Sequence, residues 1–109
     1  MDEPITIDDF KKVEIRIGEI LSAEPIEGSD KLLKLRVNFG DRERQVLSGI
    51  KAYFPEPQAL VGKRCPFVTN LAPRSMMGLE SQAMVLAAGG AETPFALFET
   101  TGAPGDRVK

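Results

Sequence analysis

The residues best suited to chemistry lie between Asn70 and Ala88, in the segment NLAPRSMMGLESQAMVLAA. Arg74 is followed within three residues by Met76 and Met77. A planar guanidinium suits phosphate groups, and flexible methionine side chains adapt to the apolar faces of bases. These residue types therefore suit a surface that contacts nucleotides. An alternative interpretation is that both methionines fill one end of a barrel.

The composition leaves little room for catalysis. There is no histidine and only one cysteine, Cys65, which excludes the usual zinc sites, disulfide frameworks, Cys-His pairs and Ser-His-Asp triads. Ser48 or Ser81 beside a lysine is the remaining candidate nucleophile, but a serine at the end of a strand is ordinary. We therefore expect no catalytic residue, no metal and no cofactor, and we interpret Cys65 as a small buried apolar residue.

Charge is distributed unevenly along the 109 residues. The net charge is −2, yet residues 31–74 hold nine Lys or Arg against three Asp or Glu, a local net charge of +6. The rest of the chain carries −8. An acidic protein of this kind presents a basic face if the fold gathers those basic segments on one side, and such a face suits nucleic acid. An ordinary solvated surface is the alternative.

The chain shows neither a membrane segment nor a signal segment. No apolar run approaches the roughly 18 residues of a membrane span. The N-terminus also lacks the basic stretch followed by an apolar stretch that marks a secretory signal. We therefore expect a cytoplasmic protein that makes no contact with a membrane.

The first half of the chain predicts a short helix followed by three strands. Thr6, followed closely by two acidic residues, is typical of a helix start. Apolar residues alternate from Val13 to Leu21, with Gly18 as a bulge or bend. They alternate again from Leu33 to Phe39, where a tight Gly40-Asp41 turn leads into the third strand and forms a hairpin. We expect the open face of this hairpin to carry Lys34, Arg36 and Arg44.

The second half predicts a connector and further short strands. Residues 52–63 should form a turn or a short helix across one end of the barrel. A strand follows from Arg64 to Thr69, where Pro66 needs an edge or a bulge because it cannot donate to a ladder. Next comes a loop in which Gly78 supplies a positive φ that the neighbouring methionines resist. The alternation from Gln82 to Ala88 then predicts an interior strand with apolar residues on both faces.

Five short strands with a connector between the third and the fourth predict an all-β, five-stranded Greek-key barrel of the oligonucleotide-binding (OB) type. Four segments in order also resemble the tRNA-binding domain family: EGSDKLLKL (27–35), QVLSGI (45–50), NLAPRSMMGLESQAMVLAA (70–88) and the closing PGDRVK. The resemblance covers about residues 5–109. YFPEPQALVGK and NLAPR look most like the C-terminal domain of bacterial methionyl-tRNA synthetase, whereas the secretion-chaperone branch usually lacks GSDKLLKL.

The resemblance implies one tRNA-binding domain over residues 1–109. Its OB barrel would span about 7–90, with a short N-terminal helix and a short connector helix. Extra C-terminal strands at about 91–109 would form a dimerisation extension. The implied function is a noncatalytic homodimer that binds tRNA by its structure, either free-standing or covalently linked to an aminoacyl-tRNA synthetase catalytic domain.

The resemblance also assigns residues to these roles. The positions that it implies for tRNA binding are Lys34, Arg36, Arg44, Asn70, Arg74, Ser75, Ser81 and Met84. The surplus apolar residues assigned to dimerisation are Phe95, Leu97 and Phe98. Many family members carry a basic residue at the positions of Ala72 and Ser75, so phosphate attraction at this loop should be weaker here. Two alternatives remain open: a dimerisation module with negligible RNA binding, and a chaperone-like relative of the same fold.

Overall fold

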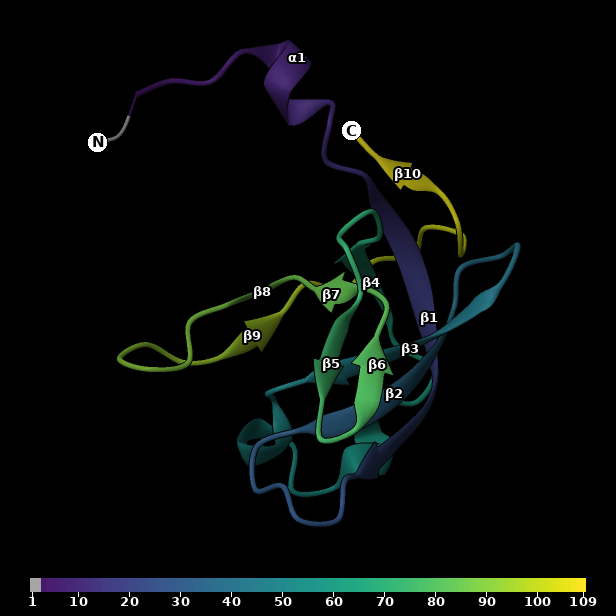
Figure 1. The fold of residues 1–109 in the computed structure, drawn as a ribbon, viewed down its shortest axis with the longest axis vertical. Helices are drawn as coiled ribbons and strands as arrows, with labels where there is room; N and C mark the ends of the chain where they lie inside the picture. Colours follow the sequence, from purple (N-terminus) through teal and green to yellow (C-terminus); the bar gives the residue numbers. More distant parts are fainter. Residues whose placement is uncertain (1–2) are drawn as a thin grey trace.

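The computed structural model describes residues 3–109, which are built mainly of short β-strands (Figure 1). The helices are α1 (Ile7–Phe10) and two 3-10 helices, η1 (Lys51–Tyr53) and η2 (Pro57–Leu60). The strands are β1 (Ile15–Pro25), β2 (Leu33–Asn38), β3 (Glu43–Ser48), β4 (Arg64–Val68), β5 (Arg74–Met76), β6 (Leu79–Ser81), β7 (Met84–Val85), β8 (Ala87–Ala88), β9 (Ala96–Leu97) and β10 (Arg107–Val108). Within the described residues, no helix is long and apolar enough to cross a membrane.

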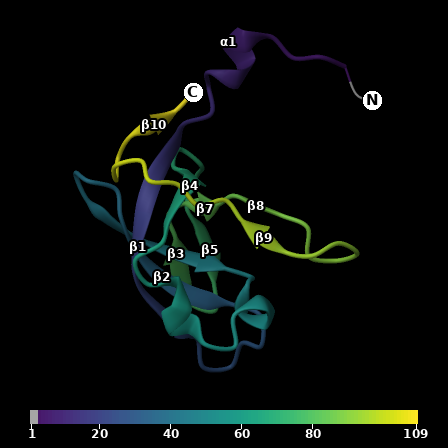
Figure 2. The same ribbon diagram turned by 180° about the vertical axis from the view of Figure 1, so that it is seen from behind.

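The main sheet curls into a barrel (Figures 1 and 2). Its strand order is β3-β2-β1-β4-β7, with every neighbouring pair antiparallel, and β10 also pairs with β1. The first half of β1 pairs with β4 and the second half pairs with β2, so this long strand spans the sheet. Beside β3, the backbone N–H of Gln82 donates to the carbonyl of Gln45 at 2.9 Å. This architecture confirms the predicted all-β, OB-like barrel.

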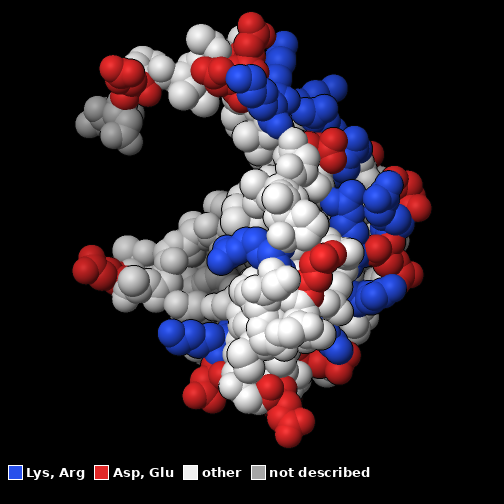
Figure 3. All heavy atoms as spheres, in the orientation of Figure 1, with Lys and Arg blue, Asp and Glu red and all other residues white. Residues whose placement is uncertain are grey.

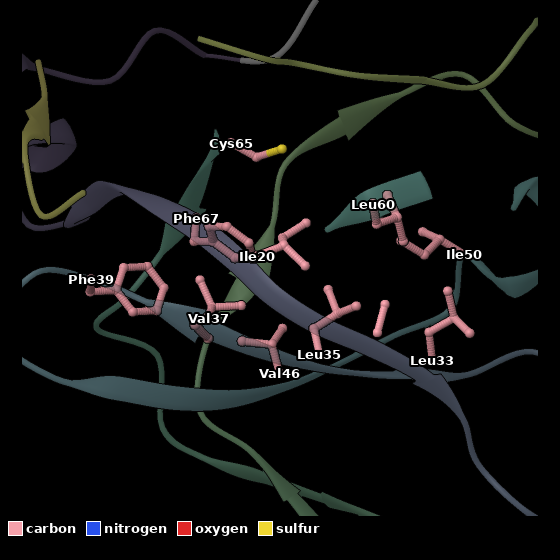
Figure 4. Close-up of a cluster of buried hydrophobic side chains, with 12 residues drawn as sticks. Ile20, Leu33, Leu35, Val37, Phe39, Val46, Ile50, Leu60, Cys65 and Phe67 are labelled. Atoms are coloured by element: carbon pink, nitrogen blue, oxygen red, sulfur yellow. The ribbon is translucent and has the colours of Figure 1, made fainter. Parts of the chain in front are cut away.

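The hydrophobic core lies inside the curl and is built from alternate residues of the strands (Figure 4). The four apolar side chains predicted to point inward between Leu33 and Phe39 are all buried. Phe67 packs edge-on against Phe39, with their ring centroids 5.3 Å apart. Cys65 is also fully buried, and burial raises the pKa of its thiol to about 11. The interpretation of Cys65 as a small core residue is confirmed.

Gly18 is buried against this core. A β-carbon at this position would lie 2.5 Å from Cγ1 of Val37 and 2.7 Å from Cε1 of Phe39, so a larger residue would force the core apart. The register of β1 and β2 shifts at Leu21, which is left unpaired and exposed. The bulge predicted at Gly18 therefore lies three residues further on, and the glycine is required by close packing.

Pro66 lies inside β4, but β7 pairs with β4 only at Phe67 and Val68, so the ladder on that side ends beside Pro66, in agreement with the predicted edge position. Its partner on β1 is Ile17. The backbone N–H and carbonyl of Ile17 are bonded instead to Asp106 and Gly105, in the turn before β10. Because Ile17 needs no hydrogen bond from β4, the missing N–H of Pro66 leaves its neighbour on β1 satisfied.

The segment after β4 differs most from its prediction. The expected loop is a hairpin of β5 and β6, and its turn residues Met77 and Gly78 both have positive φ, at 53° and 76°. This is the geometry of a type I′ turn, which suits a two-residue hairpin. The interior strand predicted for residues 82–88 is instead two short strands, of which β7 lies at the end of the main sheet and β8 lies outside it.

Two segments stand away from the barrel in both ribbon views (Figures 1 and 2). One is α1, which begins as predicted, with the Thr6 hydroxyl accepting a hydrogen bond from the Asp9 N–H at 3.1 Å. The other is the hairpin of β8 and β9, whose turn projects while Leu97 of β9 packs against the core. The predicted connector is present as η1 and η2, and the extra C-terminal strands are β9 and β10.

Candidate nucleic-acid interface

The outer face of β2 and β3 continues onto the β5–β6 hairpin. Directly opposed residues of an antiparallel pair share a face, so Lys34 shares one with Leu47, and Arg36 shares one with Gln45. The side-chain amide of Gln45 donates to the carbonyl of Glu80, in β6, at 2.9 Å. We call this surface the hairpin face, and it consists of Lys34, Arg36, Gln45, Leu47, Arg74, Met76 and Met84.

A small pocket of about 70 Å³ opens in the hairpin face. Arg74 and Ser81 line it together with the apolar side chains of Leu47, Leu71, Ala72, Met76, Ala83 and Met84. Leu71 and Met84 are 48% and 46% exposed, so the apolar wall reaches the surface. An apolar surface beside a guanidinium can hold the face of an unstacked base or a ribose while the cation meets a phosphate.

Ion pairing decides which basic side chains are available to a ligand. Of the nine Lys and Arg in residues 31–74, four have a carboxylate within 4 Å: Arg36, Arg42, Lys63 and Arg64. Within residues 3–109, no carboxylate lies so close to the other five, which are Lys31, Lys34, Arg44, Lys51 and Arg74. Figure 3 shows basic side chains from α1 to the tip of the β2–β3 hairpin, with acidic ones between them. The basic surface is therefore interrupted.

Arg44 does not lie on the hairpin face, contrary to the sequence prediction. It is paired with Val37, so it points to the opposite face from Lys34 and Arg36. Its guanidinium donates to the carbonyl of Thr69 at 2.7 Å and lies 5.6 Å from the centroid of the Phe39 ring. These contacts hold the side chain half-buried at one end of the barrel.

Comparison with known proteins agrees with this geometry. A family model described as "Putative tRNA binding domain" matches residues 15–107, which is most of the chain. The chain belongs to the tRNA-binding domain family. The recognition made from the sequence segments is thereby confirmed.

Similar crystal structures cover nearly all of this tRNA-binding domain. A MetRS-related protein from Pyrococcus horikoshii is 35% identical, with a TM-score of 0.92 over 99% of this chain and 100% of that chain. The CsaA chaperone protein of Picrophilus torridus is 28% identical, with a TM-score of 0.85 over 97% of this chain and 100% of that chain. The C-terminal domain of Plasmodium vivax p43 is 26% identical, with a TM-score of 0.80 over 92% of this chain and 61% of that chain. The fold is thus similar to both synthetase-related and chaperone proteins.

Two of the polar residues assigned to tRNA binding hold the tRNA-binding domain together. The Asn70 side chain accepts from the N–H of Glu14 at 2.8 Å and donates to the carbonyl of Lys12 at 2.6 Å. The buried Ser81 hydroxyl accepts from the N–H of Leu47 at 3.0 Å and lies 3.2 Å from the carbonyl of Ala83. Asn70 therefore ties the N-terminal segment to the barrel, and Ser81 ties β6 to β3.

We predict that Ser81→Ala lowers the free energy of unfolding by about 1–3 kcal/mol, because the N–H of Leu47 loses its acceptor. Chemical denaturation measures this change. Ser75→Ala is the matched control, since Ser75 is exposed in β5 and should leave stability unaltered. Equal stability of the two variants would contradict a structural role for Ser81.

The residue before Asn70 joins the same network. The Thr69 hydroxyl donates to the carboxylate of Glu14 at 2.6 Å, and Arg16 lies 3.1 Å from that carboxylate. The hydrogen bond from Thr69, and then that from Arg16, lower the pKa of Glu14 below its ordinary 4.5. The lowered pKa means that this contact stabilises the fold above about pH 4.5 and that the stabilisation is lost as the pH falls through the pKa of the folded state.

Two of the three apolar residues assigned to dimerisation already pack against their own chain. Phe95 stacks on Tyr53 with a centroid distance of 4.2 Å, and it meets Phe54 edge-on at 5.9 Å. Leu97 also packs against the core of its own chain. Phe98 is 50% exposed, so of these three it presents the most apolar surface to a partner.

A larger apolar surface at the N-terminus escaped the sequence analysis. Ile7, Phe10, Val13 and Val108 line a groove of about 340 Å³ between α1 and β10, together with Lys11, Arg107 and Lys109. Ile5 and Ile7 are 69% and 65% exposed. The available signal was the spacing of Ile7 and Phe10, which places both side chains on one side of a helix.

Proposed function

We propose that this domain binds tRNA through the hairpin face and acts as a noncatalytic homodimer. The main observation in support of tRNA binding is the pocket beside Arg74. Among the described residues, no carboxylate lies within 4 Å of this cation. Lys34 adds a second such cation on the same face. Membership of the tRNA-binding domain family makes tRNA the ligand that this surface suits best.

The proposed mode of binding is electrostatic and structural. Cations on the hairpin face meet phosphates, and Met76, Met84 and Leu71 lie against exposed bases or riboses. Ser81 is committed to the barrel, and Arg74 is assigned to a phosphate, so neither polar side chain of the pocket is left to read a base edge. Recognition should therefore depend on the shape of the tRNA more than on its sequence.

Amide hydrogen exchange with and without unfractionated tRNA tests this surface. We expect tRNA to slow exchange in residues 70–81 and in β2, and to leave the β8–β9 hairpin unaltered. Protection confined to the β8–β9 hairpin or to α1 would contradict the hairpin face as the binding site. The control is an equal concentration of duplex DNA, which should protect these residues far less.

The homodimer is proposed from unpartnered apolar surface. Phe98 is half exposed, and the groove between α1 and β10 is lined mainly by apolar side chains. Exposed apolar surface of this kind is buried most simply by a second copy of the same chain. A dimer would also offer two tRNA sites, which raises apparent affinity without new contacts.

We predict that the wild-type domain sediments as a dimer and that Phe98→Asp shifts it toward monomer, since a carboxylate would be desolvated in the interface. Sedimentation velocity measures the distribution. Met77→Asp is the matched control, because Met77 is 54% exposed in the turn of the β5–β6 hairpin and belongs to neither of these apolar surfaces. A wild-type monomer at micromolar concentration, or a Phe98→Asp variant that remains dimeric, would refute this interface.

We also propose a link to methionyl-tRNA synthetase, either as its C-terminal domain or as a free-standing equivalent. The similarity to the MetRS-related protein of Pyrococcus horikoshii supports this proposal. Adding the domain to a catalytic fragment of such a synthetase should lower the tRNA concentration needed for half-maximal aminoacylation. An unaltered tRNA dependence would contradict the link.

A second candidate function is binding of apolar peptide segments. The half-exposed Leu71 and Met84 line the hairpin pocket with Met76, and methionine-rich surfaces accept varied partners. Similarity to the CsaA chaperone protein of Picrophilus torridus also favours it. If this is the function, the domain should suppress aggregation of an unfolded model protein, and added tRNA should compete.

A further inference from the structure

An ion pair lies in the hairpin face, on the β2–β3 part of the sheet. The strand register places Arg36 of β2 between two uncharged side chains, Ser22 of β1 and Gln45 of β3. Glu43 lies two residues before Gln45 in β3, so it points to the same side and is a diagonal neighbour of Arg36. The Nε of Arg36 donates to the Glu43 carboxylate at 2.9 Å.

This ion pair is open to water and to any ligand of the face. The Arg36 side chain is 55% exposed and that of Glu43 is 49% exposed. An ion pair this exposed contributes little to the stability of a fold. A phosphate that approaches the guanidinium is attracted by it and repelled by the carboxylate bonded to it, and the two interactions largely cancel. The pair therefore matters more for the ligand than for the fold.

A second carboxylate lowers the charge of the same region. Glu24 of β1 is directly opposite Lys34 in the register, although among residues 3–109 no ion pair within 4 Å joins them. A small pocket of about 120 Å³ is lined by Ser22, Glu24, Lys34, Leu35, Arg36 and Gln45. The two cations of this region are thus balanced by Glu24 and Glu43, and only Lys34 keeps a cation that is not bonded to a carboxylate.

The other end of the hairpin face has a different character. In the part of the chain that the structure describes, Arg74 has no carboxylate within 4 Å, and it lies beside the apolar wall formed by Leu71 and Met84. An RNA loop offers unstacked bases to such a wall as well as phosphates. A duplex keeps its bases stacked and offers mainly its phosphates. A face that is neutral at one end and apolar at the other therefore favours the RNA loop.

We propose that Glu43 is a specificity-determining residue of the tRNA interface, because it competes with phosphate for Arg36. The resemblance assigns Arg36 to tRNA binding, but here its charge is withheld by a carboxylate of its own hairpin. The inference rests on the proposed function, since it concerns the same face. A like charge held beside a binding surface suppresses wrong partners. The partners suppressed here are polyanions without unstacked bases, such as duplex DNA.

The test compares Glu43→Gln with Glu99→Gln in titrations of unfractionated tRNA and of duplex DNA at several salt concentrations. Each change removes one carboxylate from an exposed ion pair, but Glu99→Gln releases Lys63, which lies outside the hairpin face. Glu43→Gln should tighten tRNA binding by about tenfold, the scale of one charge-assisted hydrogen bond. It should also make the log-log salt slope steeper by about 0.7. Glu99→Gln should match the wild type.

Duplex DNA provides the readout for specificity. Its affinity should rise more than that of tRNA in Glu43→Gln, because a duplex releases more counterions for each phosphate contact. The preference for tRNA over duplex DNA should therefore fall. An unaltered preference would contradict the assignment of Glu43 to specificity.

A double variant, Arg36→Gln with Glu43→Gln, identifies the source of the gain. It replaces a neutral ion pair by two neutral side chains, so tRNA affinity and salt slope should return to nearly the wild-type values. A double variant that binds as tightly as Glu43→Gln would overturn the inference, because the gain would then not depend on the release of Arg36. Thermal melting should show all variants folded, with nearly equal melting temperatures.

The remaining outcomes separate this inference from the proposed function. If neither the wild type nor Glu43→Gln bound tRNA at 50 mM salt, both would be overturned. If the wild type bound tRNA and Glu43→Gln matched Glu99→Gln, the role of Glu43 alone would be overturned and the proposed function would stand.

Discussion

Phe67→Ala should lower the free energy of unfolding by about 3–5 kcal/mol, the cost usual for a fully buried phenylalanine. The Phe67 side chain has no exposed surface and lies at the centre of the strand core, edge-on to Phe39 (Figure 4). Removing the ring would leave a cavity that the surrounding strands cannot fill without breaking their ladders. Urea denaturation followed by circular dichroism measures the change.

The matched control is Phe98→Ala, which removes the same ring from a half-exposed position. Its effect on a monomeric sample should stay below about 1 kcal/mol, since much of the ring already contacts water. Equal losses of stability for the two variants would contradict the placement of the core between β1, β2 and β4.

Lys34→Gln combined with Arg74→Gln should weaken tRNA binding by about 100-fold. Each lost cation accounts for about one charge-assisted hydrogen bond, or roughly a factor of ten. The salt slope should become shallower by about 1.4, twice the single-strand value for one phosphate. Fluorescence titration with labelled tRNA at four salt concentrations measures both quantities.

The control for this pair is Lys12→Gln combined with Lys63→Gln, which changes the net charge by the same amount. Both lysines are paired with carboxylates, on Asp9 and Glu99, and neither belongs to the hairpin face. If the two double variants bound tRNA equally, overall charge rather than the hairpin face would account for binding.

Much of the barrel was predictable because its strands and turns are indicated by patterns among neighbouring residues. Alternation between Leu33 and Phe39 correctly predicted the buried face of β2. The Gly40-Asp41 turn predicted the β2–β3 hairpin, and residues at equal distances from a two-residue turn pair directly. That rule places Arg44 opposite Val37, as the structure does. The error over Arg44 came from neglecting this register, since a shift of one residue moves a side chain to the other face.

The site was harder to predict because its contacts are distant in sequence. Asn70 bonds to Lys12 and Glu14, and Ser81 bonds to Leu47, across 34 to 58 residues. Residue type alone does not distinguish a serine that binds RNA from one that closes a barrel. The turn at Met77 was missed because positive φ is unusual for a residue with a side chain, and here the type I′ geometry of the hairpin imposes it.

The packing of the C-terminal residues was also hard to predict, because their contacts are distant in sequence. Phe95 and Leu97 follow the barrel in sequence, and so they seemed surplus to its core. In the structure, Phe95 packs on Tyr53 and Phe54, and Leu97 packs against the core, because the chain turns back across the connector. Local patterns report how apolar a segment is, but they do not report which surface it covers.

The most direct test of the central claim is the affinity of the wild-type domain for unfractionated tRNA at 50 and 200 mM salt. About four phosphate contacts give a log-log slope near −3, so the affinity should fall by about 50-fold over this interval. Duplex DNA should bind far more weakly at both concentrations. Failure to bind tRNA at 50 mM salt, or an affinity that does not change with salt, would contradict a tRNA interface built on Lys34 and Arg74.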